Sequence, residues 1–364
     1  MIKKMLQAVG ERGFSLVESL VALVLMLVVT GAVFGLLNPS SMASRTQPEA
    51  IDVQQRARVG IDAIQRDLLA AGAGLGSGPA VGPLVNYHAP VVPRRMGLQS
   101  ADAYNLARAD AITIQRAAGS YVQTTVRDPM APGALDLTVN EPPNCPSRNG
   151  VCGLSQDMTI LVFDPISNFD SFVIRQVQAQ TVSLLSRQRS PSAGYAPGAY
   201  VAEAEFDTYW HDPAMRQLRH YDGYQTDVPV VDNVVALGFE YFGDPDPPTR
   251  PKPPLGTANC LYDAAGNAIS GLSQLPPQGG SLAPLSLSTL SDGPWCGAGD
   301  NRFDADLLRI RRVRVTIRIQ ATQAGHRGTG ADYVNPGFAK SSQLAVPDYL
   351  AVFDVAPRNL NLGR

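Results

Sequence analysis

Charged side chains and recognisable catalytic motifs are scarce in this sequence. Only 17% of its 364 residues are Asp, Glu, Lys or Arg, and the formal net charge is −2. Nucleic-acid binding requires a clearly basic surface, so we do not expect DNA or RNA as a partner. The sequence also lacks the Gly-x-Ser-x-Gly, His-Glu-x-x-His and Cys-x-x-Cys patterns of common hydrolases, metalloproteases and zinc sites. We therefore predict a protein that is not an enzyme and that binds no cofactor or metal ion.

One long apolar segment lies near the N-terminus. Residues 14–37 form a run of 24 residues in which Glu18 is the only ionisable side chain. As a helix this run would rise about 36 Å, enough to cross a hydrocarbon core of about 30 Å. Lys3, Lys4 and Arg12 precede it, which places the N-terminal end on the cytoplasmic side of a membrane. The run is too long for the apolar region of a secretory signal peptide.

Glu18 is an unexpected residue in such a segment. A carboxylate within a membrane helix costs about 2.5–3.5 kcal/mol on insertion scales. One interpretation is that Glu18 lies at the membrane interface and reaches water. The other is that it has a charged partner, because two buried charges are tolerated as a pair and costly singly.

Residues 13–18, Gly-Phe-Ser-Leu-Val-Glu, followed by the apolar run, resemble the class III signal of type IV pilins and pseudopilins. The resemblance implies that a prepilin peptidase cuts after Gly13, removes the leader of residues 1–13 and methylates Phe14. It also implies that Glu18 pairs with the terminal amine of Phe14 in a neighbouring subunit. The implied partners are the lipid bilayer, an inner-membrane assembly platform, the major pilin and other minor pilins.

Residues 38–72 are expected to form an amphipathic second half of the same helix. Four apolar residues share one stripe, which suits a helix laid against a sheet: Ala57, Ile61, Ile64 and Leu68. Pro39 and Pro48 predict a kink or a local break between residues 38 and 48. The glycine-rich residues 72–78 predict the helix end and a linker.

Beyond residue 72 the pattern changes to short strands and turns, which predicts a β-rich periplasmic head over residues 73–364. Strands are predicted at residues 111–115, 121–126, 158–163, 172–185, 230–242, 311–321 and 343–355. The second is able to pair with the first, and a turn is predicted within residues 172–185. Within 311–321 apolar and polar residues alternate, and a change of parity near Arg311 predicts a bulge. The predicted fold class is α+β, with the long helix packed on an antiparallel sheet.

Residues 244–303 are predicted to be a large insertion on one edge of this sheet, because they are rich in Pro, Ser and Leu. The four cysteines allow three connectivities, of which we favour the sequence-local pairs Cys145–Cys152 and Cys260–Cys296. Disulfides persist outside the cytoplasm, where the topology places these residues. No histidine lies at ligand spacing from a cysteine, which argues against zinc.

Two polar clusters have both a functional and a structural interpretation. Arg312, Arg314 and Arg318 share one strand face, which suits phosphate binding or a face that is solvated or covered by acids. We favour the second interpretation because no aromatic residues interleave with the arginines to stack on bases. Residues 209–212, Tyr-Trp-His-Asp, with the nearby His220 and Tyr221, suit a carbohydrate or partner surface, but we favour packed strands.

Two acidic pairs have the spacing of partial calcium loops. In each pair two carboxylates are two residues apart, and the pairs are Asp244 with Asp246 and Asp304 with Asp306. Neither pair continues into the further oxygen ligands, glycine and terminal glutamate of a complete calcium loop. We do not expect a calcium site.

Among pilin-like proteins the chain is most similar to the large minor pilins of the PilW type, through loose patterns at residues 56–72, 110–115, 231–241, 310–319 and 357–359. The resemblance implies a minor pilin that primes or caps a type IV pilus and supports adhesion or twitching motility. It would cross the inner membrane once and then enter the pilus fibre or its tip. The larger size and the insertion depart from a major pilin.

Two alternatives remain open. The same loose patterns suit the J-type minor pseudopilin of a type II secretion system. A membrane-tethered periplasmic enzyme or binding protein is the alternative of a different class.

Overall fold

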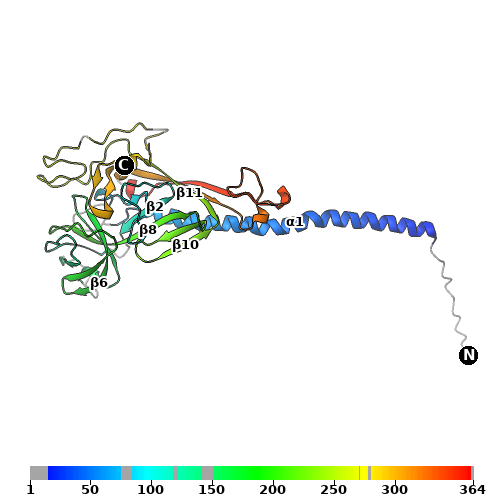
Figure 1. Ribbon diagram of the computed structural model, residues 1–364, viewed down its shortest axis with the longest axis horizontal. Coiled ribbons are helices and arrows are strands. Elements are labelled where there is room, and N and C mark those ends of the chain that lie inside the picture. The colour runs from blue at the N-terminus through cyan, green and yellow to red at the C-terminus, as the bar shows by residue number, and fades with distance from the viewer. Residues whose placement is uncertain are drawn as a thin grey trace, which may run out of the picture. The chain divides into compact units, whose positions relative to one another are not determined.

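The structure is a computed structural model that describes residues 15–74, 84–117, 122–141, 151–269, 271–277 and 280–361. The chain forms two compact units. One combines the residues up to Asp52 with residues 321–347, and the other combines residues 53–320 with residues 348–364. Helix α1, Leu16–Leu69, contributes to both units and is drawn in blue shades in Figure 1.

Helix α1 continues without interruption from Leu16 to Leu69, so of the two outcomes predicted between residues 38 and 48, a kink or a local break, the local break is wrong. Pro39 and Pro48 each remove one backbone N–H donor. Good helix formers lie near both prolines in the sequence and favour continuation of the helical turns: Leu36, Leu37 and Met42 near Pro39, and Gln47, Glu49 and Ala50 beside Pro48. The glycine-rich stretch does end the helix, since Gly72 adopts a φ of 68° just beyond it.

In the first unit, residues 321–347 group with the N-terminal part of the helix. They contain the short 3-10 helices η6 (Ala324–His326) and η7 (Ser342–Leu344). The Thr322 N–H donates a hydrogen bond of 2.5 Å to one carboxylate oxygen of Glu49. The other oxygen of Glu49 lies 3.8 Å from His326 Nδ1. These contacts tie the segment to α1.

In the described part of the second unit, the strands form three antiparallel sheets. The first has the order β1 (Val91–Val92), β2 (Ala111–Ala117), β8 (Tyr200–Asp212), β5 (Thr159–Phe163), β6 (Phe169–Gln178), β7 (Thr181–Ser186) and β4 (Asp136–Thr138). Off this path, β3 (Gln123–Thr125) and β9 (Gln217–Tyr221) pair with β8, and β10 (Asp227–Asp232) pairs with β9.

The second sheet has the order β12 (Ala283–Leu285), β11 (Val234–Gly243), β15 (Ile310–Ile319) and β16 (Tyr349–Val355). The third is the pair β13 (Trp295–Cys296) and β14 (Phe303–Asp304). Short 3-10 helices lie between the strands: η1 (Leu84–Asn86), η2 (Val151–Gly153), η3 (Thr289–Ser291), η4 (Gly299–Asn301), η5 (Ala305–Arg309) and η8 (Asn359–Asn361). The first two sheets are joined where the Phe239 N–H of β11 donates to the Ala109 carbonyl at 2.7 Å.

The strand predictions are confirmed in position, with three differences in detail. Residues 121–126 contain β3, but it pairs with β8 instead of with β2, because β8 is long enough to hold both strands along its length. Residues 230–242 divide into β10 and β11 at Asn233, and of residues 343–355 only Tyr349–Val355 form a strand, β16, because Ser342–Leu344 form η7. Residues 172–185 divide into β6 and β7 at Ala179, which confirms the turn predicted within them. Both dividing residues have positive φ, which ends a strand. The predicted bulge is confirmed, since Arg311 is left unpaired between Ile310 and Arg312.

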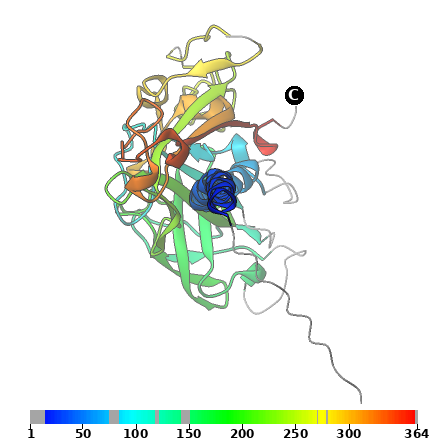
Figure 2. The ribbon, with the colours of Figure 1, turned by 90° about the vertical axis from the view of Figure 1, so that its right-hand side faces the viewer.

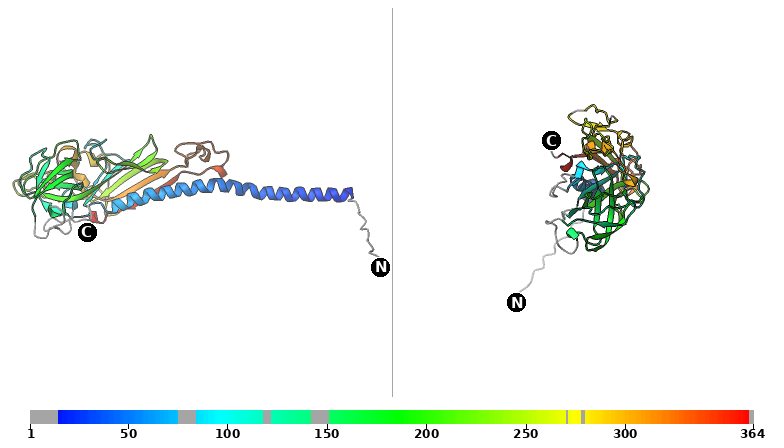
Figure 3. Two further views of the ribbon diagram at one scale, coloured as in Figure 1. Left: turned by 90° about the horizontal axis from the view of Figure 1, so that it is seen from below. Right: turned by 90° about the vertical axis from the view of Figure 1, so that its left-hand side faces the viewer.

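Helix α1 packs on both of the larger sheets of the second unit through a stripe of buried residues: Val53, Ala57, Gly60, Ile64 and Leu68. The predicted stripe is therefore correct except that Ile61 is only half buried. A Cβ atom on Gly60 would lie 3.2 Å from Ile317 of β15 and 3.3 Å from Val231 of β10. The helix thus lies over the junction of the two sheets, and Figure 3 shows its light-blue end running along the strands.

The insertion of residues 244–303 adds ordered structure to the sheet edge. Its strand β12 pairs with β11, Tyr241 opposite Leu285, at one edge of the second sheet. In Figure 2 this region is the yellow loop and strand. Cys260 and Cys296 are joined by a disulfide and are both buried, so the insertion is pinned at two points far apart in its sequence.

Gly243, at the end of β11, lies opposite Ile310 next to the bulge at Arg311, so a substitution there tests the packing at the bulge. A Cβ atom there would lie 2.3 Å from the Arg309 carbonyl oxygen and 2.8 Å from Leu285 Cδ1, whereas one on Gly238 of the same strand would meet its nearest neighbour at 3.8 Å. We expect Gly243→Ala to lower the free energy of unfolding by about 3 kcal/mol through overpacking. Gly238→Ala is the control and should be neutral or stabilising by about 0.5–1 kcal/mol. Urea unfolding of the full chain in detergent measures both, and equal stability of the two variants would contradict the packing at the bulge.

His88 is fully buried in an aromatic cluster of the second unit. Its ring lies 5.0 Å from that of Phe169 and 5.8 Å from that of Phe163. Burial lowers the pKa of His88 from 6.5 to about 3, because the charged imidazolium loses its hydration. The folded protein therefore holds this histidine neutral under conditions in which the unfolded chain protonates it.

This difference predicts a loss of stability in acid. The unfolded chain binds a proton at His88 below pH 6.5, and the folded protein does so only near pH 3, so the contribution is complete above pH 6.5 and decreases as the pH falls. At 1.36 kcal/mol per pKa unit, the full loss in the free energy of unfolding is about 5 kcal/mol. His88→Phe should remove this component, so urea titrations at pH 7, 5 and 4 should show the wild type losing more stability than the variant. Parallel pH profiles would contradict the prediction.

Candidate functional site

The predicted processing and assembly residues lie at the start of helix α1. Gly13 and Phe14 fall outside the described residues, whereas Glu18 lies in the first turn of α1. The Ser15 N–H donates to Glu18 Oε2 at 3.3 Å, and the Glu18 N–H donates to Ser15 Oγ at 3.2 Å. These reciprocal bonds form a capping box, which satisfies two N–H groups that the helix itself leaves unpaired. The Ser-x-x-Glu pattern is the sequence signal that would have predicted it.

The capping box fixes where the Glu18 carboxylate lies. It holds the carboxylate beside the helix N-terminus, where the partial positive charge of the helix dipole favours an anion. Residue 14 directly precedes the Ser15 N–H that Glu18 accepts. The side chain is therefore held close to the position where cleavage after Gly13 would create a new amino group.

The helix that follows Glu18 is apolar on all sides. Leu16–Gly35 has a mean hydropathy of 2.5 over 20 residues, and none of it is buried by the described part of the protein. Leu16 and Phe34, near its two ends, are 82% and 68% exposed. Within it the exposed Thr30 hydroxyl donates to the Met26 carbonyl of the same helix at 2.6 Å. By length and composition this helix is able to cross a bilayer.

The structure shows one of the two predicted cysteine pairs. Cys260 and Cys296 form a disulfide that closes a segment with a sequence separation of 36. Cys152 is buried in η2, but Cys145 lies outside the described residues. The Cys145–Cys152 pair therefore stays a prediction.

The arginines of β15 are engaged by side chains on the neighbouring strands of the second sheet. Arg314 Nε lies 2.8 Å from Asp354 of β16, and Arg318 Nε lies 3.0 Å from Asp348. The Arg312 guanidinium lies over the ring of Phe242, 4.4 Å from its centroid. The face is thus one of paired charges and cation–π contacts, in line with the structural interpretation.

The aromatic and histidine residues of β8 are also used in packing. Tyr209 is buried and donates from its hydroxyl to Asp67 at 2.5 Å. The Trp210 ring faces the Arg95 guanidinium at 4.9 Å, and His211 Nε2 lies 3.0 Å from the Val234 carbonyl oxygen. These contacts agree with packed strands.

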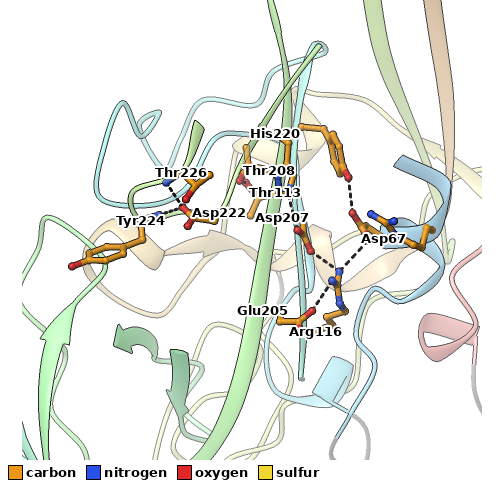
Figure 4. A network of polar contacts seen from close by, with 12 residues as sticks. Asp67, Thr113, Arg116, Glu205, Asp207, Thr208, His220, Asp222, Tyr224 and Thr226 are labelled. Atoms are coloured by element: carbon orange, nitrogen blue, oxygen red, sulfur yellow. Dashed lines mark hydrogen bonds and ion pairs between the residues drawn. The ribbon is translucent and has the colours of Figure 1, made fainter. Parts of the chain in front are cut away.

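A largely buried ionic network with one half-exposed member, Glu205, joins the end of α1 to β2 and β8. Figure 4 shows Arg116 of β2 pointing between three carboxylates. Its guanidinium lies 2.5 Å from Asp207, 2.6 Å from Glu205 and 3.6 Å from Asp67. His220 of β9 contacts the other oxygen of Asp207 at 2.7 Å. Residues so distant in sequence give no local signal for this network.

The pKa of Asp207 reports the balance of forces within the network. Burial alone would raise its pKa, but the hydrogen bond from His220 and the positive charge of Arg116 outweigh burial and hold the pKa below its ordinary value. Asp207 is therefore ionised in the folded protein. Arg116 is the cation that makes this possible.

Two groups of side chains have the proximity of metal ligands. Ligand atoms of Asp67, Asp207 and His220 lie within 4.8 Å of one another, but the Arg116 guanidinium already pairs with both carboxylates. A bound cation would have to compete with that guanidinium, so these residues do not fit a metal site.

The second group is Asp292, Asp304 and Asp306. The Asp306 N–H donates to Asp304 at 2.8 Å, and Asp306 itself lies 2.7 Å from Arg309 Nε. Burial raises the pKa of Asp306 to about 7, with Arg309 acting in the opposite direction. Because the acids are held by a backbone donor and an arginine, the geometry gives no reason to assign calcium here.

Comparisons with known proteins identify the N-terminal segment. Residues 10–34 match the family model of the prokaryotic N-terminal methylation motif. The match supports a type IV pilin-like or pseudopilin-type protein, with processing by a prepilin peptidase and membrane anchoring of a periplasmic head. No match was found among curated proteins or among solved structures.

Replacing Arg116 tests the ionic network. Arg116→Met would leave Asp67 and Asp207, whose side chains are 5% and 13% exposed, without their cation. Removing one partner of a buried ion pair costs about 3–5 kcal/mol. The cost should shrink as the pH is lowered, because protonation neutralises the uncompensated carboxylates.

Arg127→Met is the matched control. Arg127 pairs with Asp128 at the surface, where both side chains are 40% or more exposed, so its loss should cost at most about 1 kcal/mol. Urea unfolding of both variants at pH 7 and pH 5 measures the difference. An Arg116 variant as stable as the control would show that the network contributes nothing.

Proposed function

We propose that this protein is a minor pilin of a type IV pilus, a non-enzymatic structural subunit that primes or caps pilus assembly and supports adhesion and twitching motility. The observation that carries the proposal is the methylation motif at residues 10–34 at the head of an uncovered apolar helix. Such a helix needs lipid or other helices around it, and a pilin passes from one to the other.

The proposed sequence of events starts in the inner membrane. Prepilin peptidase cuts after Gly13 and methylates Phe14, which leaves an amine next to Ser15. The assembly platform then extracts the helix from the bilayer into a bundle of pilin helices. Glu18 neutralises the Phe14 amine of a neighbouring subunit, so that both charges are buried as a pair. The capping box supports this role, because it holds the carboxylate at the helix N-terminus before any neighbour arrives.

The size of the second unit supports a place at the tip. Its two larger sheets and the insertion of residues 244–303 make it bulky, and a bulky head crowds a tightly wound fibre. A subunit at the end of the fibre avoids this crowding. The proposed partners are therefore the major pilin and the other minor pilins that start the fibre.

A J-type minor pseudopilin of a type II secretion system is the second candidate, because the matched motif occurs in pilins and pseudopilins alike. Deletion of the gene separates the two. A minor pilin is expected to be needed for surface pili and twitching, and a pseudopilin for the release of exported proteins. Normal pili together with failed secretion would favour the second candidate.

Two substitutions of Glu18 test the proposed assembly step. Glu18→Ala removes both the charge and the capping bond, whereas Glu18→Gln removes the charge and keeps a side chain that is able to cap. We expect both variants to insert into the membrane and to begin at methylated Phe14, and both to be at least about tenfold depleted from sheared fibres, since an unpaired buried amine is costly. Thr30→Ala, which alters a polar residue of the same helix, is the control.

N-terminal mass spectrometry and immunoblots of sheared fibres provide the measurements. Wild-type incorporation of Glu18→Gln would show that the cap, and not the charge, is what assembly requires. A wild-type chain that still carried Met1 and never entered a fibre would overturn the proposed function as a whole.

A further inference from the structure

The second unit contains an open cavity of about 540 Å³ between the insertion and the first sheet. Residues 249–254 of the insertion form one wall. The other wall is formed by Asn86 at the end of η1, Tyr87, Pro165 between β5 and β6, and Tyr200 of β8. The volume falls within the range of about 300–1,000 Å³ that is usual for small-molecule sites.

The wall formed by the insertion is held in place by side-chain hydrogen bonds. The Asn259 amide donates to the carbonyls of Pro251 at 2.8 Å and Pro165 at 3.3 Å, which links the two walls. The Tyr262 hydroxyl donates to the Thr249 carbonyl at 2.8 Å. The disulfide at Cys260 lies next to Asn259 in the sequence. The cavity is therefore preformed, which lowers the entropic cost of binding.

The cavity is positively charged. Arg250 and Lys252 line it, and its lining contains no Asp or Glu. Both cations are exposed, and neither forms an ion pair within the described ranges of the chain. Lys252 is held over the Tyr262 ring, 5.2 Å from its centroid. An anionic ligand is therefore favoured over a neutral or cationic one.

The other donors of the cavity are side chains. Four of its ten lining residues are prolines, which have no N–H to offer a ligand. The Tyr87 and Tyr200 rings lie 5.3 Å apart in an edge-to-face arrangement. Burial, followed by the neighbouring Tyr200, raises the pKa of Tyr87 to about 12, so its hydroxyl stays protonated at neutral pH. Phenols and an amide suit hydroxyl groups, and tyrosine and proline rings suit the apolar face of a sugar.

We propose that this cavity binds an acidic oligosaccharide of the uronic acid class. The carboxylate of the sugar pairs with Arg250 and Lys252. Its hydroxyl groups bond with Tyr87, Tyr200 and Asn86, and its ring packs against the tyrosine and proline rings. The site would give the proposed adhesive role a ligand, but binding by the isolated protein does not depend on fibre assembly, so the two proposals fail separately.

Calorimetric titration of the full chain in detergent with trigalacturonate tests the proposal. We expect saturable binding, with neutral maltotriose and inorganic phosphate each at least about tenfold weaker. Arg250→Gln with Lys252→Gln should weaken trigalacturonate binding roughly tenfold or more through the loss of charge-assisted hydrogen bonds. Both residues are at the surface, so the fold should be unaffected.

Arg175→Gln with Lys340→Gln removes the same charge from exposed positions outside the cavity and should leave affinity within about twofold. Tyr200→Phe, which keeps the ring and removes the hydroxyl, should weaken binding of the sugar without creating binding of phosphate. Absence of trigalacturonate binding would overturn the proposal. So would equal affinity for phosphate, or equal losses in the two double variants.

Discussion

In the second unit, helix α1 lies directly against the junction of the two larger sheets at Gly60, and the burial of the helix residues on either side depends on this contact. Ile317 of the second sheet and Leu218 and Val231 from β9 and β10 of the first sheet meet at this one residue. A Cβ atom there would lie 3.2–3.4 Å from all three side chains, so any larger residue would require them to move. The closeness allows Ile64 and Leu68 to be buried completely, each contributing about 1.5–3 kcal/mol. The helix is therefore what holds the two sheets together along their shared edge.

The C-terminal end of the helix is fixed by polar contacts. Arg116 and Tyr209 both contact Asp67, and the Gly72 N–H donates to the Gln115 carbonyl at 2.9 Å. Apolar packing alone tolerates small rotations and slides of a helix, whereas these directional bonds specify one register. Asp67 and Asp207 are largely buried and depend on the Arg116 guanidinium, so partial assembly of this region would leave two buried carboxylates without their cation.

The two surfaces to which functions are proposed have opposite character. The helix from Leu16 to Gly35 is uniformly apolar and is able to contact lipid or like helices without directional bonds. The cavity beside the insertion is lined by cations, phenols and prolines, and it is shaped by the Asn259 and Tyr262 hydrogen bonds. The role proposed for the first surface is anchoring and assembly, and the role proposed for the second is recognition. They occupy separate parts of the sequence, so each is open to change without loss of the other.

The N-terminal segment was determined by the sequence alone, because its properties depend on residues that are neighbours along the chain. The length of the apolar run indicates a membrane helix without reference to any fold. The residues before Phe14 and the single carboxylate at Glu18 indicate the processing motif in the same way. The same holds for the alternation within β15 and for the bulge at Arg311, which are local patterns of period two.

Only the tertiary structure showed which strands pair and which residues from distant parts of the chain come together. Three features bring together residues that are far apart in sequence. They are the pairing of β3 with β8, the contacts among Asp67, Arg116 and Asp207, and the cavity lined by Tyr200 and Arg250. The rule that proline interrupts a helix did not hold here, because α1 continues through Pro39 and Pro48. Local propensity gives each segment a preference of a kcal/mol or so per residue, about the size of one packing contact, so long-range contacts select the final arrangement.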